Sequence, residues 1–377
     1  MKFTVGIGLL GCGTVGAKVA DRLQGEHDAL ERRAGTHYEL RAVAIRSIQK
    51  QRPRSLDPHL FTCDARSIVD DPDVDVLIEC IGGTNEAAEF VERALDRGRH
   101  VITANKDLIA TQGPRLQALA AARGVTLRFE AAVASAIPIV RTLDEALAGD
   151  DIISVAGVVS GTCTSVLSMM EEGADYAEAL SEAQRAGFAE ADPSNDVDGI
   201  DAAHKLALLV QLAFGLAVIS PRIRRTGIAG ITRRDVARAR MLGQRIRLVA
   251  AATRTVDGAR AEVSPVLLPE NHSFAQTAGV ENVVRIFARD AGVLELRGTG
   301  AGGTASASAV LGDFVSVLRG IGEGRDIARR RRTNTLEPAI AVNPLFTSLT
   351  RSSDLPQYPL WDDNLTDTPA AHALLAL

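Results

Sequence analysis

The sequence predicts an α/β protein, with a doubly wound parallel sheet in its first part and a second domain of the α+β class after it. Apolar strand-like runs alternate with helical patterns from residue 3 to residue 133. A G-x-G-x-x-G motif follows the first run, and from about Leu143 the alternation gives way to mixed strand and helix patterns. The length of 377 residues also exceeds that of one ordinary domain.

Each element follows from its local pattern. Short apolar runs predict buried parallel strands, and apolar residues three or four apart predict helices. In the first part, strands are expected at 3–11, 38–46, 74–83, 100–105 and 125–133, and helices at 14–33, 85–99 and 113–124. In the second part, the patterns predict a strand, glycine turn and helix at 150–170, helices at 175–187 and from about 199 to 217, and strands at 245–255, 259–269 and 292–300. Asp198, just before the long helix, is expected to cap it.

The first strand runs into Gly11, and Gly13 and Gly16 follow at the spacing of a dinucleotide-binding turn. Gly11 permits a tight turn, Gly13 lets the backbone approach a pyrophosphate, and Gly16 allows helix and strand to pack closely. The helix N-terminus, with Thr14 and Val15, then faces the phosphates. A chance glycine cluster is the alternative, but the position between a first strand and a helix favours a Rossmann-type cofactor site containing these five residues.

Arg46 ends the second strand, where NAD-dependent enzymes usually place a carboxylate for the ribose 2′-hydroxyl. A carboxylate repels a 2′-phosphate, whereas a guanidinium pairs with it. Arg46 therefore favours NADP over NAD. Use of NAD stays open, and a solvated basic loop is the alternative interpretation.

An acid-rich loop leads into the long apolar helix through GFAEADPSNDVDGIDAAHKLALL, residues 187–209. Because residues four apart share a helix face, Asp201 is expected beside Lys205. Leu209, Leu212 and Leu216 continue that face. A lysine in line with an apolar stripe and next to a carboxylate is suited to acid/base catalysis. A purely structural ion pair is the alternative.

Composition narrows the class of protein. Hydrophobic residues make up 46% and charged residues 24%, which is typical of a globular chain. The net charge of −5 gives no reason to expect nucleic acid, and the RRRR run at 329–332 is interpreted as a solvated helix end. The longest apolar stretch, residues 206–220, contains a Gln and predicts a buried helix rather than a membrane span. The cysteines have no paired spacing, so we expect free thiols and a cytoplasmic location.

Several segments in combination resemble homoserine dehydrogenases. They are VLIECIGG (76–83), HVITANKDLIA (100–110), EAAVASAIPIV (130–140), the loop and helix at 187–209, RTGIAGIT (225–232) and RGTGAGGTASASAVLGD (297–313). The resemblance covers about Thr4 to Gly324. It implies reversible reduction of L-aspartate 4-semialdehyde to L-homoserine with NADPH or NADH, in threonine and methionine biosynthesis. It also implies a nucleotide-binding domain joined to a catalytic and dimerisation domain, with the late segment returning to the first domain.

The resemblance makes Lys205 the catalytic acid/base and places Lys106 beside the nicotinamide and the substrate. Glu190 and Asp201 correspond to a pair that binds the substrate's polar groups. The chemistry agrees, because hydride arriving at an aldehyde carbon leaves an alkoxide that an ammonium stabilises and protonates. The sequence leaves open which lysine transfers the proton.

Turn residues complete the expected site. Gly161 and Thr162 keep the family's turn near the substrate, and Gly187 is assigned to the cofactor site. Gly300 lies in a second glycine loop at 298–303, which is expected to close over the cofactor. A plain strand–helix turn is the alternative for that loop.

The EAAVASAIP segment is similar to the family's loop for a monovalent cation. There, backbone carbonyls bind Na⁺ or K⁺, and the matching positions are Glu130, Val133, Ser135 and Ile137. This expectation rests on resemblance alone.

Two segments depart from the family pattern. SGTCTS at 160–165 lacks the usual Asn and aromatic residues, and Phe188 replaces a Tyr. Both changes lie near the expected substrate. They leave open a related dehydrogenase for another small amino-acid alcohol or aldehyde, or a cofactor-binding regulatory protein without turnover. The retention of two lysines and two acids argues against the last.

The expected domain plan has four parts. A nucleotide-binding domain covers 1–142, a catalytic and dimerisation domain 143–300, a returning helix 301–330, and a tail of unknown role 331–377. A homodimer or homotetramer that binds a small amino-acid substrate, and neither nucleic acid nor membrane, is expected.

Overall fold

The chain is described by a computed structural model, which defines residues 4–47, 56–216 and 222–323. These residues form two compact units, one of 4–136 with 302–323 and one of 137–301. The first boundary therefore falls at residue 136, six positions before the one expected from sequence. The expected tail at 331–377 lies outside the described residues.

The first unit contains a parallel six-stranded sheet in the order β3-β2-β1-β4-β5-β6. Its strands are β1 (Thr4–Leu10), β2 (His37–Ala44), β3 (Phe61–Thr62), β4 (Val76–Glu79), β5 (His100–Thr103) and β6 (Leu127–Arg128). Its helices are α1 (Thr14–Gly25), α2 (His27–Ala34), α3 (Ala65–Asp70), α4 (Glu86–Asp96), α5 (Lys106–Arg123) and α12 (Gly303–Gly322), with 3₁₀ turns η1 (Pro58–Leu60) and η2 (Glu130–Ala132). The expected doubly wound sheet is confirmed, and the strand order reverses between β1 and β4, where such sheets bind ligands.

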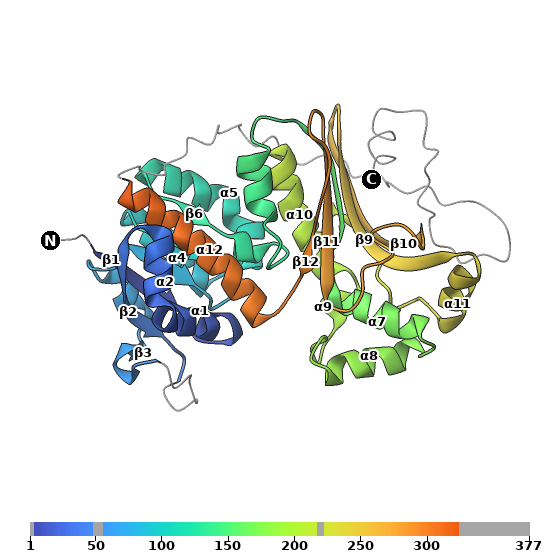
Figure 1. Cartoon of the computed structure of the whole chain (residues 1–377), viewed down its shortest axis with the longest axis horizontal. Helices are drawn as coiled ribbons and strands as arrows, with labels where there is room; N and C mark the ends of the chain where they lie inside the picture. The colour runs from blue at the N-terminus through green and yellow to red at the C-terminus, as the bar shows by residue number, and fades with distance from the viewer. Residues whose placement is uncertain (1–3, 48–55, 217–221, 324–377) are drawn as a thin grey trace. The chain divides into compact units, whose positions relative to one another are not determined.

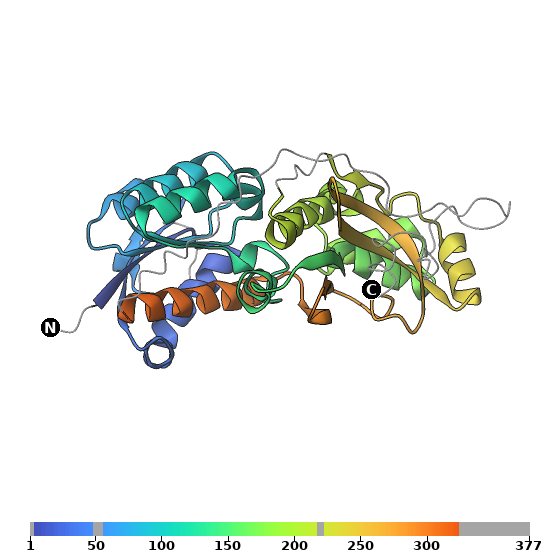
Figure 2. The same cartoon turned by 90° about the horizontal axis from the view of Figure 1, so that it is seen from above.

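Helices cover both faces of this sheet (Figures 1 and 2). The α12 helix packs against α1 and α2, and α4 packs against α5. The core of the unit joins fully buried residues of β1 and α1, such as Leu9 and Val19, to Phe314 of α12. A segment from the end of the described chain thus completes the hydrophobic core of the N-terminal sheet.

The second unit contains a mixed six-stranded sheet in the order β12-β11-β7-β9-β10-β8. Its strands are β7 (Ile152–Val158), β8 (Arg224–Arg225), β9 (Gln244–Thr255), β10 (Gly258–Pro269), β11 (Glu281–Ala288) and β12 (Gly292–Thr299). Its helices are α6 (Ile139–Arg141), the π-helical turn η3 (Thr142–Ala146), α7 (Gly161–Glu171), α8 (Tyr176–Arg185), α9 (Ser194–Val197), α10 (Ile200–Phe214) and α11 (Arg233–Met241). This unit is the expected α+β domain.

Three local expectations were wrong. No strand was expected at 281–288, where β11 lies. The α5 helix begins at Lys106 and not at 113, because Asn105 caps it and Pro114 is accommodated inside it. Gly199, with φ +75°, caps α10 in place of Asp198, because a left-handed glycine separates α9 from α10.

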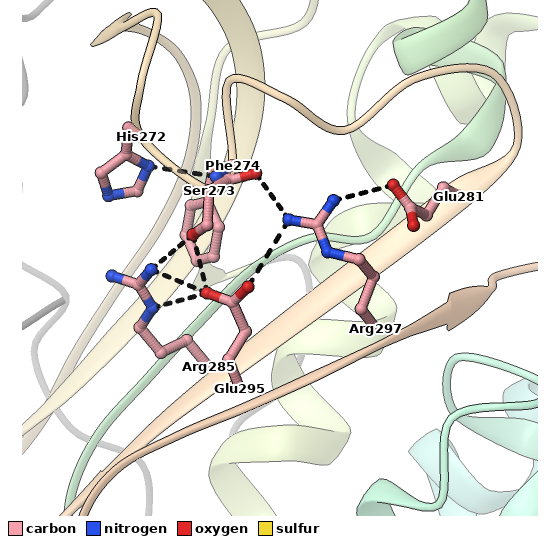
Figure 3. A network of polar contacts seen from close by, with 7 residues as sticks. All are labelled: His272, Ser273, Phe274, Glu281, Arg285, Glu295 and Arg297. Atoms are coloured by element: carbon pink, nitrogen blue, oxygen red, sulfur yellow. Dashed lines mark hydrogen bonds and ion pairs between the residues drawn. The ribbon is translucent and has the colours of Figure 1, made fainter.

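Polar side chains tie β11, β12 and the loop before them together (Figure 3). Arg285 and Glu295 lie opposite each other in the antiparallel register and form an ion pair of 2.7 Å. The Ser273 hydroxyl donates to the same carboxylate at 2.7 Å. Arg297 reaches Glu281 at 2.9 Å and donates to the Ser273 carbonyl at 2.7 Å. The start of β11 is therefore anchored at Glu281.

Among the described residues, no helix combines the length and apolar character needed to cross a bilayer.

Candidate active site

The turn between β1 and α1 has the geometry that a phosphate-binding turn requires. Gly11 has a φ of +94°, and a Cβ there would lie 2.7 Å from the carbonyl oxygen of Cys80. A Cβ on Gly16 would lie 2.0 Å from the carbonyl oxygen of Gly11, whereas Gly13 faces open space. The open space at Gly13 leaves room for a pyrophosphate to approach the backbone. The first N–H groups of α1 are available there, because a helix leaves them without intrahelical partners.

A cavity of about 410 Å³ opens beside this turn. Its lining includes Gly11, Gly13, Ile45, Arg46, Ser47 and Phe90. Arg46 is exposed and borders the cavity from the end of β2. The volume lies in the range of small-molecule sites, and apolar walls with a cationic rim fit an adenosine that carries phosphate.

A buried carboxylate that was not predicted from the sequence organises the neighbouring strand ends. Glu79, at the end of β4, is fully buried and accepts the backbone N–H groups of Ile81 at 2.8 Å and Gly82 at 3.0 Å. It also accepts the hydroxyl of Thr103 at the end of β5. The sequence signal that could have identified Glu79 is a single acid in an otherwise apolar strand. A charge buried with that strand requires hydrogen-bond partners.

The same network reaches Lys106. The Thr103 hydroxyl accepts the Asn105 N–H at 3.0 Å, and the Asn105 side chain donates to the Gly83 carbonyl at 2.6 Å. The other amide atom of Asn105 accepts the Leu108 N–H at 3.1 Å and caps α5, whose first residue is Lys106. Glu79 and Asn105 therefore fix the backbone from which Lys106 projects.

The late glycine loop is divided between the two units. Gly303 opens α12 in the first unit, and a Cβ there would lie 2.5 Å from the carbonyl oxygen of Thr14. Gly303, which was not predicted as a site residue, thus makes the contact with the nucleotide-binding turn. Gly300 belongs to the second unit, where its α-carbon faces Asn282.

Lys205 has two acceptors in the second unit. Its Nζ lies 2.8 Å from Asp201 Oδ2 and donates to the Val159 carbonyl, just after β7, at 2.7 Å. The side chains of Lys205 and Asp201 are 12% and 8% exposed. The helical spacing accounts for the contact with Asp201. The strand-end carbonyl is a long-range partner with no sequence signal.

The N-terminus of α7 holds the acid-rich loop in place. Gly161 is the first residue of α7. The Thr162 hydroxyl lies 2.7 Å from the Phe188 carbonyl and 2.8 Å from Asp196 Oδ2, while Cys163 Sγ donates to the Asp196 carbonyl at 3.2 Å. Burial raises the pKa of the Cys163 thiol to about 12, so this group remains a protonated donor. The Thr162 side chain, in the turn expected near the substrate, is thus engaged with the acid-rich loop.

The loop itself exposes its side chains. Phe188 is 42% exposed, and Glu190 is also exposed. The Glu190 carboxylate forms no ion pair with any described residue, while its backbone carbonyl accepts from Gln184 at 3.0 Å. Gly187 has a φ of +75° and turns the chain out of α8. Glu190 is therefore accessible to a cationic ligand group.

The expected cation segment follows β6 and shows an unusual backbone. Ala134 and Ser135 have φ of +53° and +48°, a region that costs non-glycine residues free energy. The Ser135 hydroxyl lies 3.1 Å from that of Ser306. Two of the four expected carbonyls already accept backbone N–H groups, Glu130 from Val133 at 3.3 Å and Ile137 from Ile139 at 2.7 Å. Within 4–47, 56–216 and 222–323, no three His, Cys, Asp or Glu side chains cluster as metal ligands.

Comparison with known proteins gives consistent matches. A family model for homoserine dehydrogenase matches residues 138–315, and a model for the NAD-binding domain of homoserine dehydrogenase matches residues 11–130. A homoserine dehydrogenase of Corynebacterium glutamicum is 43% identical over 321 residues, which is 84% of this chain and 72% of that protein.

Solved structures agree. A homoserine dehydrogenase from Thiobacillus denitrificans superposes with a TM-score of 0.81 at 37% identity, covering 96% of this chain and 80% of that one. A hyperthermophilic archaeal homoserine dehydrogenase in complex with NADPH superposes with a TM-score of 0.69 at 27% identity, covering 84% of this chain and 98% of that one.

Proposed function

The chain belongs to the homoserine dehydrogenase family, whose members are NAD(P)-dependent oxidoreductases acting on a CH–OH group, and from this premise we propose that Lys205 is the acid/base for the reacting oxygen. The substrates on this proposal are L-homoserine and L-aspartate 4-semialdehyde. The observation that carries it is the position of Lys205 Nζ between the Asp201 carboxylate and the Val159 carbonyl.

An ammonium has three N–H bonds. Two of those on Lys205 are directed at Asp201 and at the Val159 carbonyl, so the direction of the third is fixed. In reduction, that third N–H donates to the substrate oxygen as negative charge develops on it, and the proton transfers to give the alcohol. In oxidation, the neutral amine keeps its two anchors and accepts the alcohol proton. When bound, a nicotinamide cofactor would supply or accept the hydride.

We propose further substrate contacts from the remaining groups. Glu190 is exposed and suited to a charge-assisted hydrogen bond with the substrate ammonium. Lys106, held at the start of α5, supplies a second cation near the cofactor. Gly161 and Thr162 contribute by fixing the acid-rich loop, because the Thr162 hydroxyl contacts the Phe188 carbonyl and Asp196.

We propose that NADP is preferred to NAD. The support is the exposed Arg46 at the rim of the cavity, where a guanidinium can pair with a 2′-phosphate. Gly11, Gly13 and Gly16, with the start of α1, would hold the pyrophosphate.

Three finer features remain proposals. Backbone carbonyls at Glu130, Val133, Ser135 and Ile137 bind Na⁺ or K⁺, supported by the left-handed backbone at Ser135. The chain acts in threonine and methionine biosynthesis as a homodimer or homotetramer. It works in the cytoplasm, supported by four cysteines that form no disulfide.

The test compares Lys205→Met with Lys106→Met by following cofactor absorbance with L-homoserine. Lys205→Met should lower kcat by about 10²–10⁴-fold, the scale of a positioned acid/base, with unchanged affinity for the cofactor. Lys106→Met should mainly raise the KM for homoserine. If the two variants show the opposite pattern, the proton transfer belongs to Lys106.

A further inference from the structure

Asn282, on β11, has an unusual environment. Its side chain is fully buried, and its Nδ2 donates to the Val159 carbonyl at 3.2 Å. Its Oδ1 has no hydrogen-bond partner among the described residues. Reversing the amide would set two oxygens against each other, so the geometry allows only this orientation. A buried acceptor without a donor destabilises a fold, and an apolar residue of similar shape avoids that cost.

The carbonyl that Asn282 contacts is the one that holds Lys205. Val159 O accepts the Lys205 ammonium at 2.7 Å and the Asn282 amide at 3.2 Å. A carbonyl oxygen has two lone pairs, so these two donors fill its capacity. They come from α10 and β11, and together they fix the direction of the acceptor that orients the lysine.

The surroundings of Asn282 are built to keep it in place. A Cβ at Gly300 would lie 2.0–2.3 Å from the amide atoms of Asn282, so any larger residue there would have to displace the Asn282 side chain. On the other side of the strand, Glu281 is paired with Arg297 at 2.9 Å (Figure 3). Because successive strand residues point to opposite faces, this pair anchors the backbone that carries Asn282.

We propose that Asn282 is a positioning residue for the acid/base lysine. It occupies the second lone pair of the Val159 carbonyl, so that Lys205 meets this acceptor in one direction and its third N–H points at the reacting oxygen. The inference rests on the proposed role of Lys205. Without the Asn282 amide, the Val159 carbonyl can accept an N–H of Lys205 along either lone pair. The third N–H of Lys205 is then no longer aligned with the reacting oxygen for proton transfer.

The test is Asn282→Leu, which removes both amide atoms at similar volume. Thr253→Val is the matched control, because Thr253 is fully buried on β9 of the same sheet and its hydroxyl also lacks a partner among the described residues. Asn282→Leu should keep its unfolding midpoint near that of Thr253→Val and bind the cofactor normally. Its kcat should fall by about 10–100-fold, as expected for a misaligned reacting group. The solvent deuterium isotope effect on kcat should rise, and Thr253→Val should leave both quantities unchanged.

A double-mutant cycle separates this inference from the role of Lys205. If Lys205→Met lowers kcat by about 10²–10⁴-fold and Asn282→Leu adds no further loss to that residual rate, Asn282 acts through the lysine. Normal kcat and isotope effect in a folded Asn282→Leu protein would overturn the inference, as would a fully additive loss. Near-normal turnover of Lys205→Met would instead overturn the proposed function. Should Asn282→Leu fail to fold, Asn282→Ala is measured against the same criteria.

Discussion

Replacing Lys205 by Met should separate the stability role of the buried ion pair from its chemistry. The two side chains are only 12% and 8% exposed, and their charged atoms are 2.8 Å apart. Lys205→Met removes the cation that faces Asp201 and leaves a buried carboxylate. Breaking such a pair from one side costs about 3–5 kcal/mol of the free energy of unfolding. The Val159 carbonyl keeps the Asn282 amide as a donor, so the loss arises mainly at Asp201.

The double variant Lys205→Met/Asp201→Leu should recover most of that stability, because apolar residues of similar volume replace a buried pair at little or no cost. Its activity should stay as low as that of the single variant. Urea unfolding followed by circular dichroism gives the stabilities, and cofactor absorbance gives the rates. A single variant as stable as the parent would refute the argument that this pair is desolvated. A double variant as unstable as the single one would refute the assignment of the cost to Asp201.

Three further outcomes are expected. Arg46→Asp should reverse or abolish a preference for NADP(H) over NAD(H) in kcat/KM. If the parent protein uses both cofactors equally well, the argument that Arg46 selects NADP(H) is wrong. Phe188→Tyr should lower the KM for L-homoserine with little change in kcat, because it restores a phenol whose hydrogen bond to a charged substrate group contributes about 1.5–3 kcal/mol to binding. An unchanged KM, together with ready oxidation of an analogue, would argue for another substrate. Glu79→Gln should lower the free energy of unfolding by about 1–3 kcal/mol, measured by thermal or urea unfolding, and should lower kcat, because one of the carboxylate's acceptor oxygens is lost beside Thr103. The control is Asp107→Asn, a change beside Lys106 at the start of α5, which tests whether any change in that turn has the same effect on kcat.

Local patterns determined a large part of this protein. The glycines at 11, 13 and 16 predict the nucleotide-binding turn, because the conformation and close packing they permit depend on residues adjacent in the chain. Asp201 and Lys205 were predicted as neighbours, because helical periodicity alone sets a spacing of four. The assignment of Gly300 to the cofactor site stays a prediction; in the described structure the α-carbon of Gly300 packs against the Asn282 side chain.

The tertiary structure decided which distant groups meet. Glu79 joins the ends of β4 and β5, and the Val159 carbonyl joins α10 to β11. No local pattern encodes these contacts, because backbone carbonyls are the same at every residue and a long-range hydrogen bond leaves no periodic signal. The sequence by itself therefore determined the glycine turn between β1 and α1 and the pairing of Asp201 with Lys205. Only the folded sheet, by bringing its strand ends together, decided how the lysine of that pair is aimed.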